Sequence, residues 1–215
     1  MSEMGLFEAM NTMRAMRRLK PDPVPLELIR KVLDAGIKAP SSQNTQPWAF
    51  LVVQDLQGKK FIQERYHQAM MSRFGLRQPA PYDSSPRARM FRAALYLAEH
   101  LHEVPVLLLV CGLRDWPAAI PPEKRAGKAP PSYGSVYPCV QNILLACRAL
   151  GLGATLTTVH MFFEEELHEH FGIPEEYGVV TLIPIGFPQG KFGPVTRRPA
   201  EEVTHFDRWE KQTPL

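Results

Sequence analysis

The sequence predicts a mixed α+β domain in which helices and strands alternate. Its 215 residues are 45% hydrophobic and 22% charged, a composition typical of chains that bury a core. Apolar residues recur at helical spacing in some segments and form short continuous runs in others. At this length we expect one domain, spanning residues 1–215.

The N-terminal quarter predicts two helices followed by a strand. Residues 5–16 form a short first helix, and the prolines of residues 20–25 make a rigid connector. In residues 29–37, apolar side chains at i, i+3, i+4, i+7 and i+8 predict a helix that stops at Pro40. Residues 48–53 are apolar and aromatic, which indicates a buried strand.

The middle of the chain predicts two further helices and a central strand. We expect a helix in residues 57–74, a proline-broken loop at residues 78–86 and a further helix after this loop. The apolar face of that helix consists of Phe91, Ala94, Leu95, Ala98 and Leu101. Residues 106–110 are continuously apolar, which favours a strand covered on both faces. Residues 115–132 are rich in Pro, Lys and Arg and are expected to form an exposed loop.

Residues 136–150 are the most apolar segment and predict a helix that is hydrophobic nearly all round. Such a helix is either central to the core or shared with a partner subunit. Pro138 is expected in its first turn or at a kink, and Gly151 and Gly153 should end it.

The C-terminal part predicts two strands, a helix and a terminal arm. Residues 154–158 indicate a short strand or turn, residues 164–171 a short helix, and residues 179–187 a last strand. Pro184 suggests that this strand lies at an edge or ends there. Residues 190–215 have no helical period, and we expect them to pack on a partner as an arm.

Charge and hydropathy disfavour several classes of function. The net charge of +3 and the lack of a basic cluster interleaved with aromatics argue against nucleic-acid binding. The longest apolar run is too short to span a bilayer, and no signal peptide is expected. The cysteines lack metal-type spacing, so we expect no metal site, free thiols and a cytoplasmic location; they are Cys111, Cys139 and Cys147.

Polar and basic residues gather in four segments. Arg14, Arg17 and Arg18 follow the first helix, where guanidinium groups can bind phosphate oxygens or a polar ring edge. Residues 40–47 place amides and hydroxyls between two prolines, in a loop suited to a flat polar ring or a sugar-alcohol chain. The alternatives are a solvated basic face and an ordinary loop.

The other two segments lie nearer the C-terminus. Residues 150–158 contain Gly-x-Gly, whose small residues allow a backbone to approach a ligand closely. This motif follows a helix, whereas a dinucleotide-binding fingerprint follows a strand, so we reject a Rossmann fold. Arg197 and Arg198 form a second basic pair beyond the last strand.

Together these segments resemble the FMN-dependent nitroreductase family from Met10 to Pro199. Arg-x-x-Arg is followed by Lys-Pro-Asp-Pro-Val-Pro, then Ala-Pro-Ser-x-x-Asn-x-Gln-Pro-Trp, Ala-Leu-Gly-Leu-Gly and Arg-Arg-Pro, in the family's order. The proline-bounded motif is the most specific of these. The resemblance implies a three-layer fold with a mostly antiparallel sheet flanked by helices, in an intertwined homodimer with FMN at the interface.

The resemblance also implies which residues contact FMN. The arginine-rich segment, with Arg14, Ala15 and Arg17, would hold the phosphate and the pyrimidine edge. Residues of the proline-bounded loop would reach the flavin from the other subunit; they are Pro40, Ser41, Ser42, Asn44 and Gln46. The backbone of three residues would face flavin N5; they are Leu156, Thr157 and Thr158. Arg197 would bind the phosphate.

The chain departs from the family pattern at two positions. Many relatives carry Arg and Ser where this chain has Met13 and Ala15, so Arg18 or Arg198 would compensate.

The resemblance implies NAD(P)H-driven, ping-pong reduction of nitroaromatic, quinone or similar small electrophilic acceptors. FMN would carry the chemistry and no protein residue would be strictly catalytic, while Arg17 would stabilise negative charge on the reduced flavin. The alternatives are a flavin-sequestering protein, a relative of reductive dehalogenases, and an interaction module without flavin. Substrate selection is expected in residues 65–90 and 115–132, and His160 is a candidate for lining the substrate pocket.

Overall fold

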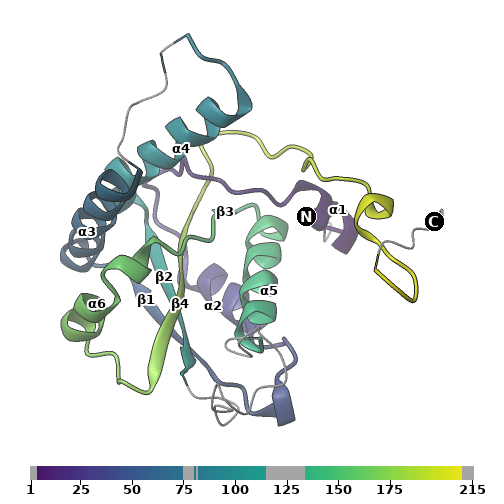
Figure 1. The fold of residues 1–215 in the computed structure, drawn as a ribbon. Coiled ribbons are helices and arrows are strands. Elements are labelled where there is room, and N and C mark those ends of the chain that lie inside the picture. The colour runs from purple at the N-terminus through teal and green to yellow at the C-terminus, as the bar shows by residue number, and fades with distance from the viewer. Residues whose placement is uncertain (1–3, 75–79, 81, 115–133, 210–215) are drawn as a thin grey trace.

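The computed structural model describes residues 4–74, 80, 82–114 and 134–209, and in this part of the chain the strands form one antiparallel sheet (Figure 1). The strands are β1 (Trp48–Val53), β2 (Val106–Leu113), β3 (Gly153–Ala154) and β4 (Tyr177–Gly186). They are ordered β1-β2-β4-β3, so β2 and β4 are central. The fold is therefore α+β, as predicted.

Helices cover both faces of the sheet (Figure 1). The helices are α1 (Leu6–Thr12), α2 (Leu26–Gly36), α3 (Leu56–Phe74), α4 (Pro86–His100), α5 (Val136–Ala149) and α6 (Glu164–Phe171). Short 3-10 turns are η1 (Ser42–Asn44), η2 (Leu101–Glu103), η4 (Val159–Phe162) and η5 (Ala200–Val203). One core lies between the sheet and α3, α4 and α6, and the other between the sheet and α2 and α5.

β2 shows why the sheet is the middle layer. Leu107 and Leu109 point into the core under α3 and α4, whereas Val106, Leu108 and Val110 point into the core under α2 and α5. Because successive side chains of a strand face opposite sides, a strand buried on both faces must be continuously apolar. The predicted two-sided burial of residues 106–110 is confirmed.

The prediction that Pro184 marks an edge or a strand end is wrong, since Pro184 is opposite Leu107 within the central strand β4. The reason lies in the short neighbour β3. Its ladder with β4 pairs Ala154 with Ile185, then breaks, and resumes only at the isolated bridge between Thr157 and Leu182. The missing N–H of Pro184 therefore falls in the gap in this ladder, where no hydrogen bond is lost.

The first helix is shorter than predicted, because residues 13–20 leave the helix and run along the sheet edge. The amide of Met16 donates to the carbonyl of Ala154 (3.0 Å), and that of Lys20 donates to Phe187 (2.8 Å). The arginines thus lie in an extended segment, not at the end of a helix as expected.

α5 begins and ends close to the predicted positions. Pro138 lies in its first turn, as expected. Gly151 follows the helix with a φ of +76°, a conformation that glycine adopts at little cost and that commonly ends helices. Gly153 does not end the helix; it is the first residue of β3.

The predicted loop at residues 115–132 lies outside the described residues, and the loop at 78–86 lies partly outside them. Much of the expected substrate-selecting segment 65–90 is helical, in α3 and α4. The first described part of the C-terminal arm runs beside α1, where the amide of Val195 donates to the carbonyl of Asn11 (2.9 Å). Figure 1 shows α1 and this arm extending together away from the body of the molecule.

Candidate functional site

The arginine segment is held against the sheet by the residues that follow α5 and β4. Leu19 forms a bridge with Pro188, and the amide of Gln189 donates to the carbonyl of Arg18 (3.0 Å). Arg14 and Arg18 are exposed, whereas Arg17 between them is half-buried. Residues 14–18 therefore form part of a fixed strand-like edge.

Gly153 allows this close approach. A Cβ atom at Gly153 would lie 2.7 Å from Cδ2 of Leu19, 3.0 Å from Cβ of Met16 and 3.3 Å from Cβ of Pro188. The sequence suggested that this glycine admits a ligand. In the structure, it is the arginine segment itself that occupies the space beside Gly153.

Arg17 is the most enclosed of the predicted ligand-binding arginines. Burial lowers the pKa of its guanidinium, and the partly compensating electrostatic neighbour is the phenol of Tyr66. No carboxylate acts on Arg17 among the described residues. A partly buried cation without a carboxylate partner is suited to an anionic or carbonyl-rich ligand, because such a ligand would offset the cost of burial.

Thr157 lies in the same neighbourhood. Its Oγ1 is 3.0 Å from the hydroxyl of Tyr66, the residue that is also the electrostatic neighbour of Arg17. Leu156 and Thr158 are exposed on either side of Thr157. The amide of Thr157 donates to the carbonyl of Leu182 (3.0 Å) and is therefore already engaged within the sheet.

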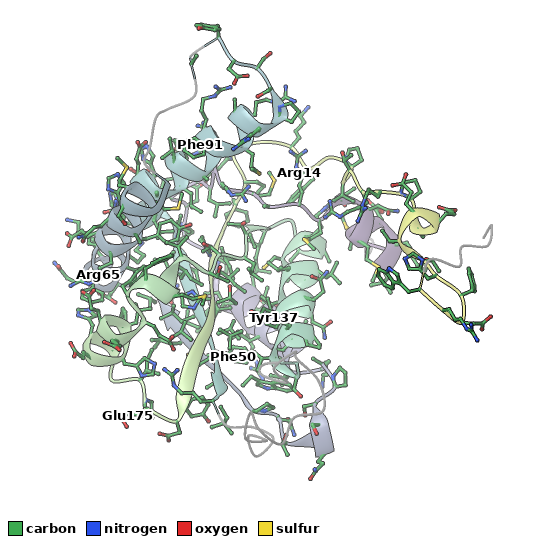
Figure 2. The ribbon with its side chains drawn as sticks, in the orientation of Figure 1. Arg14, Phe50, Arg65, Phe91, Tyr137 and Glu175 are labelled. Carbon is green, nitrogen blue, oxygen red and sulfur yellow. The ribbon has the colours of Figure 1, made fainter. Side chains whose placement is uncertain are left out.

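The other arginines lie on the neighbouring elements and in the arm. The guanidinium of Arg18 lies 4.2 Å from the ring centre of Tyr96, a cation–π contact. Arg148, in the last turn of α5, donates to Thr12 Oγ1 (2.8 Å) and so ties α5 to the segment that leads to Arg14. Figure 2 shows Arg14 in this segment, between α4 and α1. Arg197 and Arg198 are exposed, in the arm that runs past α1.

The proline-bounded loop lies at the opposite end of α5. The amide of Ser42 donates to Oγ of Ser135 (3.1 Å), the residue just before α5, and Ser41 Oγ accepts from the amide of Gln46 (3.0 Å). α5 has 14 residues and is therefore about 21 Å long. Within one chain, the structure does not bring this loop to Arg17 or Thr157.

The backbone of this loop is strained. Gln43, Asn44 and Gln46 have φ values of 51°, 54° and 51°, in the left-handed region that non-glycine residues rarely adopt. Such residues persist where their surroundings hold them, and they concentrate at binding sites. Pro40, Ser42, Asn44 and Gln46 are exposed, so their polar groups are accessible.

His160 does not line an open pocket. Its side chain is fully buried, and Nε2 donates to the carbonyl of Val179 at 2.6 Å. Burial holds the pKa of His160 below its usual value, so the ring is neutral near pH 7. The structure assigns it a core position between η4 and β4.

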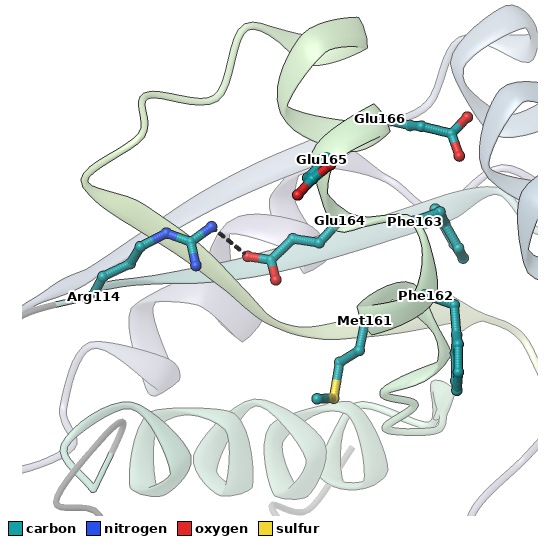
Figure 3. Close-up of a pocket in the computed structure, with 7 residues that line it drawn as sticks. All are labelled: Arg114, Met161, Phe162, Phe163, Glu164, Glu165 and Glu166. Atoms are coloured by element: carbon teal, nitrogen blue, oxygen red, sulfur yellow. Dashed lines mark hydrogen bonds and ion pairs between the residues drawn. The ribbon is translucent and has the colours of Figure 1, made fainter.

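A cavity of about 410 Å³ lies beside α6 (Figure 3) and contains none of the predicted site residues. Arg114 donates to Glu164 at 2.8 Å, and the same carboxylate oxygen accepts from the amide of Val179 at 3.0 Å. These bonds tie the end of β2 and the start of β4 to α6. Their evident role is structural.

Sequence reasoning missed Tyr66, which links two of the predicted segments. It lies on the buried face of α3, four residues after Ile62 and four before Met70. A tyrosine on an apolar helical stripe is a usable signal, because a buried phenol requires a hydrogen-bond partner. The spacing alone could not say which partner.

A metal site and a membrane-spanning helix are the alternatives to this site. No group of His, Cys, Asp and Glu in the described residues is arranged to hold a metal ion. Among the same residues, no helix is both long and apolar enough to cross a bilayer.

Known proteins share the sequence and the fold. The model of the Nitroreductase family matches residues 12–187. The chain is 28% identical to a Methanothermobacter thermautotrophicus protein named as an NADH dehydrogenase/NAD(P)H nitroreductase, covering 97% of this chain and 90% of that protein. It is 31% identical to the NADH dehydrogenase of Thermus thermophilus, covering 88% and 90%.

A solved structure of oxidised iodotyrosine deiodinase, bound to FMN and 3-iodo-L-tyrosine, superposes with a TM-score of 0.73. The match covers 95% of this chain and 100% of that one, at 23% identity. This likeness confirms the three-layer fold.

Proposed function

The chain belongs to the nitroreductase family, and we propose that it is an FMN-dependent oxidoreductase that uses NADH or NADPH to reduce small electrophilic acceptors such as nitroaromatics and quinones. The observation that carries the proposal is the half-buried Arg17, which has no carboxylate partner among the described residues and lies near Tyr66 and Thr157. A partly desolvated guanidinium fits the electron-rich pyrimidine edge of a flavin.

The residues available at this end of the molecule suit FMN. Arg14, Arg18, Arg197 and Arg198 supply exposed cations for a phosphate, and Arg17 supplies an enclosed one for the ring. When bound, FMN supplies the capacity to accept a hydride and pass electrons on. Arg17 would stabilise negative charge that develops on the reduced ring, and the exposed Leu156 and Thr158 would be free to contact it.

The site requires a second copy of the chain. The proline-bounded loop and Arg17 are separated by the length of α5, so one chain cannot present both to a single flavin. An apolar hollow of about 390 Å³, formed by α1, α2 and α5, also lies open. Leu6, Phe7 and Met10 are exposed on α1 beside it. We therefore propose a homodimer in which each loop reaches the partner's flavin and the arm, of which residues 190–209 are described, packs across the interface.

Purification and a visible spectrum test the cofactor. The proposal expects a yellow protein, or a colourless one that binds added FMN with stoichiometry one per chain. Steady-state oxidation of NADH and of NADPH is then measured with a nitroaromatic or a quinone. A protein that neither carries nor binds FMN would contradict the proposal.

Two other outcomes have a definite meaning. FMN that stays oxidised in the presence of both nicotinamides indicates a flavin-sequestering protein. Turnover of 3-iodo-L-tyrosine with release of iodide, in place of nitroaromatic reduction, indicates a reductive dehalogenase; the structural likeness to a deiodinase makes this assay necessary.

The buried, free cysteines accord with a reducing compartment, and we propose that the protein is located in the cytoplasm.

A further inference from the structure

Tyr66 occupies a buried position that packing alone does not explain. Its side chain is 3% exposed on the inner face of α3, among the apolar residues of the core. Its hydroxyl lies 3.0 Å from Oγ1 of Thr157, which belongs to the segment after β3. A phenylalanine would fill the same volume, so the hydroxyl has a polar role that the apolar core does not require.

The surroundings favour one direction for this hydrogen bond. Among the described residues, Thr157 Oγ1 is the hydrogen-bond partner of the buried Tyr66 hydroxyl. Because a buried phenol proton needs an acceptor, Tyr66 is the donor in this bond and Thr157 Oγ1 the acceptor. Burial raises the pKa of Tyr66, so this proton is present near neutral pH.

Thr157 Oγ1 thereby becomes an acceptor from two sides. It accepts from Tyr66, and it lies 3.4 Å from the amide of Val159, which also donates to it. A hydroxyl has one proton and two lone pairs. With both lone pairs occupied, the proton of the Thr157 hydroxyl is left to donate to a further group.

We propose that Tyr66 is a positioning residue of the FMN site, which fixes the Thr157 hydroxyl as a hydrogen-bond donor to the oxidised flavin. This inference rests on the proposed function. Oxidised flavin presents nitrogen and oxygen acceptors along its polar edge, and reduction converts some of these acceptors into donors. A hydroxyl fixed as a donor therefore binds the oxidised form more tightly than the reduced form.

The test measures affinity and potential in four variants of the full chain. Tyr66→Phe and Thr157→Val each remove one partner, the double variant removes both, and Thr157→Ser keeps the hydroxyl. Tyr177→Phe is the matched control, since Tyr177 packs partly buried against the same core. The dissociation constant of oxidised FMN comes from titration of the apoprotein, and the two-electron midpoint potential from equilibration with a reference dye.

We expect Tyr66→Phe and Thr157→Val each to weaken the binding of oxidised FMN about tenfold without changing the affinity for reduced FMN. The midpoint potential then rises by about 30 mV, the equivalent of tenfold for two electrons. The double variant should bind no more weakly than either single variant, because both remove the same interaction. Thr157→Ser and Tyr177→Phe should stay within twofold of wild type.

Several results would overturn the inference. One is an unchanged affinity of Tyr66→Phe for oxidised FMN. Another is weaker binding of both oxidised and reduced FMN with an unchanged midpoint potential. A third is a double variant whose loss of affinity equals the product of the two single losses. If Tyr66→Phe does not fold, equal affinities of Thr157→Val and Thr157→Ser also overturn it. Failure of wild type to bind FMN overturns the proposed function as well, and this is seen before any variant is compared.

Discussion

Substitution of Gly153 by alanine tests whether the arginine segment depends on its close approach to β3. The added Cβ would lie 2.7 Å from Leu19 Cδ2 and 3.0 Å from Met16 Cβ. The leucine methyl can rotate away, but the Met16 Cβ is fixed to its backbone, so the segment must move outward by a few tenths of an ångström. Arg17, which follows Met16 directly, moves with it.

Overpacking of this kind costs about 1–3 kcal/mol. For a chain of this size, each kcal/mol lowers the melting temperature by about 2–4 °C, so we expect a loss of about 2–12 °C. Displacement of Arg17 should also weaken FMN binding about tenfold, which corresponds to about 1.4 kcal/mol. Melting of the apoprotein by circular dichroism and titration with FMN measure the two effects separately.

Gly190→Ala is the matched control, since no atom lies within 4 Å of a Cβ built at Gly190. It should melt and bind FMN as wild type does. If Gly153→Ala also melts like wild type, the close contact with Leu19 and Met16 is refuted. If it melts lower but binds FMN equally well, the dependence of Arg17 on this contact is refuted.

Three further predictions follow from single side chains. Arg17→Ala should weaken FMN binding about 10- to 150-fold, the equivalent of one charge-assisted hydrogen bond of about 1.5–3 kcal/mol. The control Arg30→Ala, at an exposed arginine, should leave FMN binding unchanged. Equal weakening by both substitutions would refute a specific role of Arg17 in FMN binding. Because the pKa of buried His160 is lowered from 6.5, the stability from its neutral form is present above pH 6.5 and is lost as the pH falls below it. As the pH falls below 6.5, the urea concentration at the midpoint of unfolding should therefore decrease in wild type and decrease less in His160→Gln. If this midpoint depends on pH in the same way in both proteins, His160 is excluded as the cause. The thiols should resist alkylation in the native protein at pH 8 and react in urea, because burial raises their pKa to about 11 in Cys111 and about 12 in Cys139 and Cys147; rapid native modification would contradict their burial.

Local patterns predicted the elements whose side-chain period is unambiguous. The strand at residues 48–53 and the helix at residues 164–171 agree with β1 and α6 to the residue. α3 begins one residue before its predicted start, and α5 ends one residue before its predicted end. In these segments, burial follows directly from the spacing of apolar residues.

Non-local pairing accounts for the errors. Residues 13–16 continue the helical pattern of α1, yet they are extended because Met16 pairs with Ala154, far away in sequence. The inner position of Pro184 depends on where β3 breaks off, which the sequence of β4 does not contain. The candidate site has the same limit: its segments were recognisable one by one, but the link from Arg17 through Tyr66 to Thr157 exists only in the folded chain.

The extended course of residues 13–20 has a consequence for what the arginines can span. On a helix, Arg14 and Arg18 would stand one turn apart, about 6 Å along the axis. In an extended segment the same four steps cover about 13 Å. The separation of Arg14 and Arg18 is thus comparable to the length of an elongated ligand with a charged end and a polar ring. Because Met16 and Leu19 anchor the segment in the core, inserting one residue after Arg14 would move Arg14 about 3 Å further from Arg17 and Arg18.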